Sequence, residues 1–235
     1  MDAGARVRRT PRSEGAGVLG DWVYGASKLV VRAVVRGVFR MEVTGSEHEP
    51  ARGPYLAVAN HWSALDPPVL GAALRRKVHF MAKQELFEIP LLRSWMRCIG
   101  TFPVRRGEPD RQAIRTALQV LEQGGVVGMF PEGTRNPRGY LLPAEPGAAF
   151  LALKARVPIL PVAILGTLEI LPKGAWVPRL GKIRVRIGPP FRVDDLVDAP
   201  DRLQRASDRI MGAIAGLMGV EPPVHGTRRA GRAAP

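Results

Sequence analysis

The sequence has a single cysteine, Cys98, few aromatic residues and no long uncharged apolar run. One cysteine cannot form a disulfide within the chain, so we expect a protein suited to a reducing compartment. A transmembrane helix needs about 20 consecutive apolar residues, and charges interrupt every apolar run before that length. The first fifteen residues carry charge and proline without an apolar core, so no signal peptide is expected.

Acidic residues are also scarce, with 21 Asp and Glu against 35 Lys and Arg and a formal net charge of +14. Such an excess favours a polyanionic partner, either nucleic acid or an anionic membrane. No recognisable nucleic-acid motif or interleaved aromatics accompany it, so no nucleic-acid partner is expected. The 235 residues, 46% of them apolar, are enough for one domain with a substantial core.

Several signatures of catalysis and cofactor binding are missing. The sequence contains no G-x-S-x-G elbow, no H-E-x-x-H pair, no cysteine cluster and no phosphate-binding G-K-S/T. Residues 15–20 match G-x-G-x-x-G formally, but no strand precedes them, so we reject a dinucleotide site there. The sequence therefore predicts no metal, no tightly bound cofactor and no covalent serine or cysteine intermediate.

Short apolar runs alternate with amphipathic segments along the chain. This order predicts an α/β single domain, with a central mixed, largely parallel sheet flanked by helices, plus an N-terminal amphipathic membrane-associated helix. The expected units are a disordered basic tail at 1–16, the interfacial helix at 17–41, the domain itself at 42–220 and a disordered tail at 221–235.

Two segments have the composition of membrane-contacting elements. In the helix over 19–41, Lys28, Arg32, Arg36 and Arg40 recur every four residues, beside a largely apolar remainder. The alternative is a helix packed on the domain with a solvated charged face. Residues 84–99 are expected to be helical or mixed, broken at Pro90, with much apolar bulk exposed.

Local proline signals set three further expectations. Pro67 follows Asp66, so a helix should begin there, with Asp66 near the N-cap and the end near Arg75. Pro161 cannot donate to a sheet ladder, so it should mark the beginning of its strand or a sheet edge. Residues 182–187 alternate strictly and predict a half-buried strand with a basic outer face.

His61 and Asp66 follow the buried strand predicted over 55–59. On one ideal helix they would lie about 140° apart, so they can meet only across a turn, which the strand–loop–helix order supplies. Asp66 would then fix the imidazole tautomer and make His61 a general base. The alternative is that Asp66 only caps the helix and His61 only occupies the loop. The carboxyl end of a strand in an α/β sheet favours the catalytic interpretation.

The segment Phe130–Arg135 leaves a second apolar strand through a Pro-Glu-Gly-Thr turn. Backbone N–H groups around Gly133, with Arg135 beside them, can form an anion-binding turn. The alternative is an ordinary turn with an exposed arginine. Because no enzymic nucleophile is evident, a base at His61 should activate a substrate hydroxyl or water directly.

Four blocks in this order resemble the glycerolipid acyltransferase family that contains the 1-acylglycerol-3-phosphate acyltransferases. They are N-H-x4-D at Asn60–Asp66, a Gly, apolar residues and Arg at 100–106, F-P-E-G-T-R at Phe130–Arg135, and V-P-I-x-P-V at Val157–Val162. The resemblance runs from about residue 40 to about residue 190. In the second block Arg106 aligns with the family's arginine, while Arg105 stands where an acid is common.

The resemblance implies a role for each matching residue. His61 would deprotonate the acceptor hydroxyl and Asp66 would orient it. The glycerol-phosphate head would be bound by Arg106, Glu132, Gly133, Thr134 and Arg135, with Lys83 as a further phosphate contact. Pro158 and Pro161 would be linked to the acyl donor or be structural.

The implied activity is transfer of a fatty acyl chain from acyl-CoA or acyl-carrier protein to 1-acylglycerol-3-phosphate, giving phosphatidate in phospholipid biosynthesis. The thioester is a co-substrate, and no cofactor is implied. The implied partners are the lysophospholipid, the thioester donor and anionic membrane lipids, at the cytoplasmic face of the cell membrane as a peripheral or monotopic protein. Other lysophospholipid, glycolipid or amino-lipid acceptors remain open, as does a non-catalytic basic membrane- or nucleic-acid-binding protein.

Overall fold

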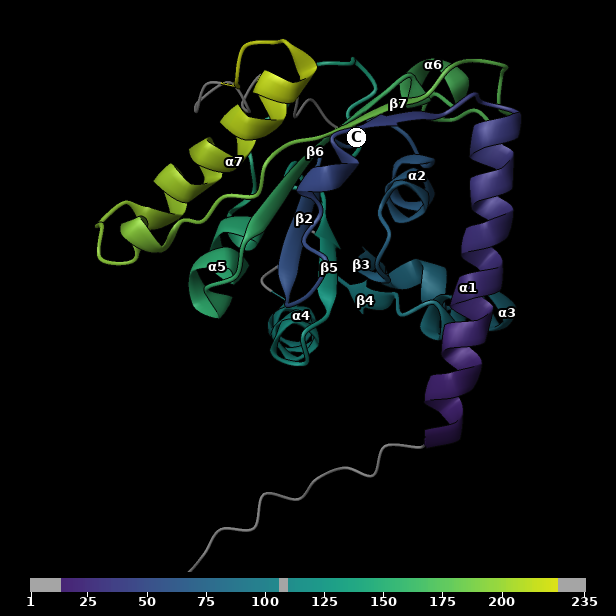
Figure 1. Cartoon of the computed structure of the whole chain (residues 1–235), viewed down its shortest axis with the longest axis horizontal. Coiled ribbons are helices and arrows are strands. Elements are labelled where there is room, and N and C mark those ends of the chain that lie inside the picture. Colours follow the sequence, from purple (N-terminus) through teal and green to yellow (C-terminus); the bar gives the residue numbers. More distant parts are fainter. Residues whose placement is uncertain (1–13, 106–109, 224–235) are drawn as a thin grey trace, which may run out of the picture.

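The computed structural model describes residues 14–105 and 110–223, with a seven-stranded sheet at the centre (Figure 1). The strand order is β1-β7-β6-β2-β5-β3-β4. The strands are β1 (Glu42–Thr44), β2 (Tyr55–Ala59), β3 (Val78–Lys83), β4 (Phe102–Val104), β5 (Val126–Met129), β6 (Ile159–Leu165) and β7 (Arg184–Ile187). All neighbours pair in parallel except β6 and β7, which are antiparallel. The predicted mixed, largely parallel sheet is confirmed.

Helices cover both faces of the sheet (Figure 1). One face carries α2 (Asp66–Ala73), with α1 (Glu14–Gly37) packed outside it, and the other carries α4 (Arg111–Glu122), α5 (Pro146–Ala155) and α7 (Arg202–Met218). The shorter elements are α3 (Pro90–Cys98), α6 (Thr167–Ile170) and the 3-10 turns η1 (Ser46–His48), η2 (Gln84–Phe87) and η3 (Asp194–Leu196). Strand β2 is buried throughout because helices cover both its sides, which explains its uninterrupted apolar run.

Several predicted boundaries need only small corrections. Helix α4 begins after Asp110, whose carboxylate accepts the N–H groups of Gln112 and Ala113 as an N-terminal cap. Helix α2 begins at Asp66, so Pro67 occupies its second position instead of its first, and the helix ends at Ala73. Strand β7 alternates exposed arginines with buried Val185 and Ile187, as predicted.

The expectation for Pro161 was wrong, because this residue lies inside β6, between β2 and β7. Its carbonyl oxygen accepts the N–H of Gly188 at 2.9 Å, so its nitrogen faces the same side. Strand β7 has already ended at Ile187 on that side. A proline is tolerated at this position in a central strand because the β6–β7 ladder ends at the neighbouring pair, Val162 and Ile187.

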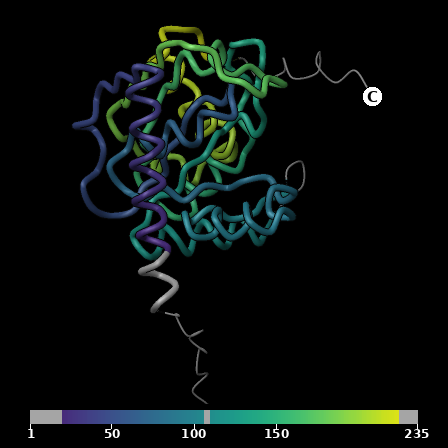
Figure 2. Tube along the Cα trace, turned by 90° about the vertical axis from the view of Figure 1, so that its right-hand side faces the viewer, coloured from purple at the N-terminus to yellow at the C-terminus, as the bar shows by residue number. Residues whose placement is uncertain are grey.

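Helix α1 runs along one side of the domain (Figure 2). It begins at Glu14 and ends at Gly37, so residues 14–16 are helical instead of belonging to the predicted tail, and Arg40 lies beyond the helix with φ +44°. Val35 and Phe39 are buried in the core, which fixes the helix on α2. The rest of the two predicted tails lies outside the described residues, apart from 221–223.

Candidate active site

The carboxyl ends of β2, β5 and β6 bring three segments together. His61 follows β2, Glu132 follows β5 and Thr167 follows β6. These strands are neighbours and parallel, so their ends lie at the same edge of the sheet. The site is therefore assembled from residues far apart in the sequence.

The predicted pair meets directly. His61 Nδ1 lies 2.9 Å from Asp66 Oδ2, and the exposed fractions of the two residues are 4% and 0%. The turn between them folds back, so that the N–H groups of Trp62 and Ser63 also donate to Asp66 Oδ2, each at 2.7 Å. A carboxylate oxygen accepts, so Nδ1 is the donor in this contact and carries the imidazole proton. Nε2 is then the nitrogen that can take a proton.

The backbone and ring of His61 are also fixed. Its N–H donates to Glu132 Oε1 at 2.7 Å, and its carbonyl accepts the N–H of Asn136 at 3.0 Å. The imidazole stacks on Phe130, with 4.2 Å between the ring centroids. Two contacts on the ring and two on the backbone thus hold this residue, as preorganised general-base catalysis requires.

Asn60 extends the sheet beside the His61–Asp66 pair, which we call the dyad. Its side-chain nitrogen donates to the Ile164 carbonyl at 2.8 Å, and its side-chain oxygen accepts the Ile164 N–H at 2.7 Å. The amide therefore mimics a backbone ladder pair between β2 and β6 after β2 has ended. These two hydrogen bonds explain the asparagine before His61, because they hold the loop that carries His61 against β6.

Glu132 is 1% exposed, and each carboxylate oxygen accepts a backbone N–H. Oε1 holds His61 and Oε2 holds Leu142 at 3.0 Å. These bonds give the residue a scaffolding role that the sequence did not predict. Its predicted contact with the acceptor head remains a prediction.

The turn after β5 differs in detail from the predicted anion cradle. Gly133 has φ +67°, a conformation that favours glycine, and its N–H donates to the Phe130 carbonyl at 3.0 Å. Thr134 beside it is exposed, and Arg135 is half-buried. Of these three residues, Arg135 is the one that reaches the cavity described next.

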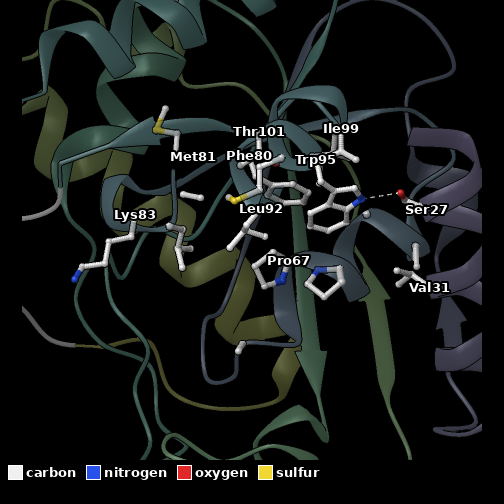
Figure 3. A pocket seen from close by; sticks show the side chains of 18 of the residues that line it. Ser27, Val31, Pro67, Phe80, Met81, Lys83, Leu92, Trp95, Ile99 and Thr101 are labelled. Atoms are coloured by element: carbon white, nitrogen blue, oxygen red, sulfur yellow. Dashed lines mark hydrogen bonds between the residues drawn. The ribbon is translucent and has the colours of Figure 1, made fainter. Parts of the chain in front are cut away.

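An apolar cavity of about 550 Å³ opens beside His61 (Figure 3). This volume lies in the usual range of ligand sites, about 300–1,000 Å³. The apolar side chains that line it include Val31, Pro67, Phe80, Leu92, Met96 and Ile99. Its polar lining includes His61, Arg135, Lys83 and Lys28.

Helices α1 and α3 close one side of this cavity. Trp95 Nε1 donates to Ser27 Oγ at 3.0 Å, which links the two helices across the cavity wall (Figure 3). Lys28 on α1 donates to the carbonyls of Arg75 and Arg76 at 2.8 and 3.3 Å. Burial, followed by the nearby charge of Arg32, lowers the pKa of Lys28 to about 8.

The remaining predicted site residues lie as follows. Lys83 lines the cavity and forms an exposed ion pair with Glu85 at 2.8 Å. Pro158 is half-buried, and its carbonyl accepts the Leu56 N–H, so it serves the sheet. Arg106 lies outside the described residues. The described residues contain no group of three or more His, Cys, Asp or Glu side chains that could hold a metal ion.

Comparison with known proteins gives the class of protein. Residues 40–165 match the model of the family described as Acyltransferase. The chain is 31% identical over 183 residues to the 1-acyl-sn-glycerol-3-phosphate acyltransferase of Bacillus subtilis, spanning 77% of this chain and 88% of that protein. This chain therefore belongs to the acyltransferase family.

Other relatives agree. The human 1-acyl-sn-glycerol-3-phosphate acyltransferase alpha is 33% identical over 73% of this chain, which spans 61% of the human protein. The crystal structure of PlsC, the 1-acyl-sn-glycerophosphate acyltransferase of Thermotoga maritima, superposes with a TM-score of 0.70 at 27% identity. That alignment covers 90% of this chain and 83% of the other. The predicted family and enzyme class are thus confirmed.

Proposed function

We propose that this acyltransferase moves a fatty acyl chain from an acyl thioester to the free hydroxyl of 1-acylglycerol-3-phosphate, giving phosphatidate. The observation that carries the proposal is the buried His61–Asp66 pair opening on a large apolar cavity. The relatives named for this acceptor support the choice of head group.

His61 acts as the general base in this proposal. Nε2 takes the hydroxyl proton as the acceptor oxygen attacks the thioester carbonyl, and the tetrahedral intermediate then expels the thiolate. The imidazolium returns the proton to the sulfur, so no group on the enzyme is changed at the end. General-base assistance of this kind contributes roughly 10²–10⁴-fold, and Asp66 stabilises the positive charge on the ring.

The phosphate of the acceptor is assigned to basic groups at the cavity. Arg135 is half-buried and lines the same cavity as His61, so it can place a phosphate close to the base. Lys83 adds an exposed positive charge at the cavity wall, and Arg106 is proposed as a further contact from the family resemblance. Gly133 and Thr134 shape the turn that carries Arg135.

The apolar cavity is assigned to a fatty acyl chain. Each methylene removed from water there contributes about 0.8 kcal/mol, which gives a long chain a strong preference for this site. An acyl thioester is already activated, so the proposal needs neither a metal nor a tightly bound cofactor. Acyl-CoA and acyl-carrier protein both present the required thioester.

Membrane association is proposed from two exposed apolar surfaces. On α1 the exposed residues are Trp22, Leu29, Val30 and Val34, with Val38 just after the helix, and around α3 they are Leu86, Ile89, Leu91 and Trp95. Phe87 and Met96, expected on the second surface, are instead buried. None of the helices that the structure describes is both long and apolar enough to span a membrane.

The charge of +14 adds attraction to anionic lipids. Lys28 faces the domain, whereas Arg36 is exposed, so only part of the predicted basic stripe is available to a membrane. We propose a peripheral or monotopic protein at the cytoplasmic face of the cell membrane.

The Trp22→Ser/Leu29→Ser variant should bind anionic vesicles more weakly than the wild type in a sedimentation assay, whereas Leu203→Ser on α7 should not. Equal binding by all three proteins would contradict this surface.

One experiment tests the substrate assignment. The purified chain is given one labelled acyl thioester and a panel of acceptors comprising 1-acylglycerol-3-phosphate, other lysophospholipids, a glycolipid and a lyso-amino-lipid. Thiol release and labelled product should be greatest with 1-acylglycerol-3-phosphate. Preferential labelling of another acceptor would overturn the head-group assignment, and no thiol release with any acceptor would overturn the catalytic one.

A further inference from the structure

Thr167 lies outside all four family blocks, yet it contacts the dyad. It is the first residue of α6, just after β6, and it is fully buried. Its Oγ1 lies 2.6 Å from Asp66 Oδ1. A carboxylate can only accept, so the threonine hydroxyl is the donor, and the distance is typical of a charge-assisted O–H···O⁻ bond.

The two oxygens of Asp66 therefore have different partners. Oδ2 accepts from His61 Nδ1 and from two backbone N–H groups, and Thr167 reaches Oδ1. A carboxylate held at both oxygens cannot turn about its terminal bond without breaking hydrogen bonds on each side. The threonine thus keeps Oδ2 directed at the imidazole.

The backbone delivers Thr167 to this position through a constrained glycine. Gly166 has φ +89°, and a Cβ there would lie 2.1 Å from the Lys182 carbonyl oxygen. Only glycine fits, so the turn from β6 into α6 is fixed. A second bond from Ser63 Oγ to the Leu171 carbonyl, at 2.8 Å, joins the dyad loop to the residue after α6.

We propose that Thr167 is a positioning residue of the dyad, which holds Asp66 in register with His61 and draws off part of the carboxylate charge. The proposal rests on the proposed role of His61 as the base. Without the threonine hydroxyl, the negative charge concentrates toward the imidazole and favours its protonated form. A smaller fraction of the enzyme then carries the free base at a given pH.

Other charged groups near His61 stay the same when Thr167 is changed. Glu132 accepts the His61 N–H after β5, and Arg135 follows in the same segment. Lys83 on β3 and Lys28 on α1 line the shared cavity. A shift in pH dependence that follows the threonine hydroxyl alone is therefore attributable to its bond with Asp66.

The test compares Thr167→Val, which keeps the shape but removes the hydroxyl, with Thr167→Ser, which keeps the hydroxyl. We expect Thr167→Val to lower kcat about tenfold, the order of one lost hydrogen bond to a charged group. KM should change less than about twofold, and the acid limb of the kcat/KM profile should move to higher pH. Thr167→Ser should retain both wild-type values.

Ser63→Ala is the matched control, because it removes a hydroxyl that bonds the Leu171 carbonyl and the Leu65 N–H but keeps the backbone N–H that donates to Asp66. It should leave the acid limb in place, even if the Tm falls. Thr167→Ala provides a second removal of the hydroxyl if the valine variant does not fold. An unmoved acid limb in the variants without the hydroxyl, or an equal shift in Ser63→Ala, would overturn the proposal.

A failure of the proposed function can be distinguished from a failure of the proposed role of Thr167. It would appear as absent acyl transfer in the wild-type chain, before any variant is compared. An NMR titration of the His61 imidazole in the wild type and in Thr167→Val needs no substrate. We expect a higher midpoint in the variant, and identical midpoints would refute the role of Thr167 whatever the acceptor.

Discussion

The change Asp66→Asn isolates the charge of the dyad from its geometry. Oδ2 accepts three donors, so the amide oxygen of asparagine should take that place. The amide nitrogen then faces Thr167, whose hydroxyl can turn to accept from it. The variant should therefore keep its fold and the imidazole tautomer while losing the negative charge.

The expected loss follows from the distance. His61 Nδ1 and Asp66 Oδ2 are 2.9 Å apart, which puts the two charge centres at roughly 4 Å. At an effective dielectric constant of about 20, one ion pair at that separation is worth about 4 kcal/mol. The imidazolium forms only as the reaction proceeds, so the missing carboxylate charge raises the transition state and not the ground state. In Asp66→Asn, kcat should therefore fall about 10³-fold.

The assay is thiol release from an acyl thioester in the presence of 1-acylglycerol-3-phosphate, with Tm measured in parallel. Glu49→Gln is the control, since Glu49 is another buried carboxylate that accepts the N–H groups of Arg75 and Arg76 at 2.7 and 3.0 Å. That control should lower Tm and leave kcat near the wild-type value. A folded Asp66→Asn enzyme with kcat within about tenfold of wild type would refute the electrostatic reasoning.

Three further predictions address the scaffold and the cavity. Glu132→Gln should lower the free energy of unfolding by about 1–3 kcal/mol, because the amide nitrogen of the new glutamine must face a backbone N–H donor. A raised KM for the acceptor at unchanged Tm would instead indicate that Glu132 binds the substrate directly. Burial lowers the pKa of Lys28 to about 8 from 10.5, so the unfolded chain binds more protons between these values and stability rises with pH there. In equilibrium denaturation, Lys28→Met should flatten this rise in the free energy of unfolding with pH, whereas Lys154→Met at an exposed site should not. An unchanged slope in Lys28→Met would contradict the lowered pKa of Lys28. Leu92→Trp should fill the cavity and reduce turnover of long acyl chains more than short ones; a uniform loss would contradict the assignment of the cavity to a chain.

Local sequence signals predicted most of the framework. Apolar runs bounded by glycine or proline marked the buried strands, and the strict alternation over 182–187 marked β7. The His61–Asp66 pair could also be predicted from local sequence. A strand, a loop and a helix that starts with a proline bring together residues five positions apart. These features depend on short stretches of chain.

The remaining features depend on contacts between distant segments. The bond between Thr167 and Asp66 joins residues 101 positions apart, and no local pattern marks that threonine. The family resemblance implied a head-group contact for Glu132, and it did not indicate that the fold directs both carboxylate oxygens to backbone N–H groups. Pro161 was placed at the beginning of its strand or at a sheet edge because the end of the β6–β7 pairing beside it could not be read from β6 alone.

The central claim is that His61 removes a proton from the acceptor hydroxyl. Its most direct test is transfer of a labelled acyl chain to 1-acylglycerol-3-phosphate by purified His61→Ala, with the thermal unfolding of the same sample recorded. We expect a cooperative unfolding transition and a turnover at least about 10²-fold below wild type. Turnover close to that of the wild-type enzyme would contradict it.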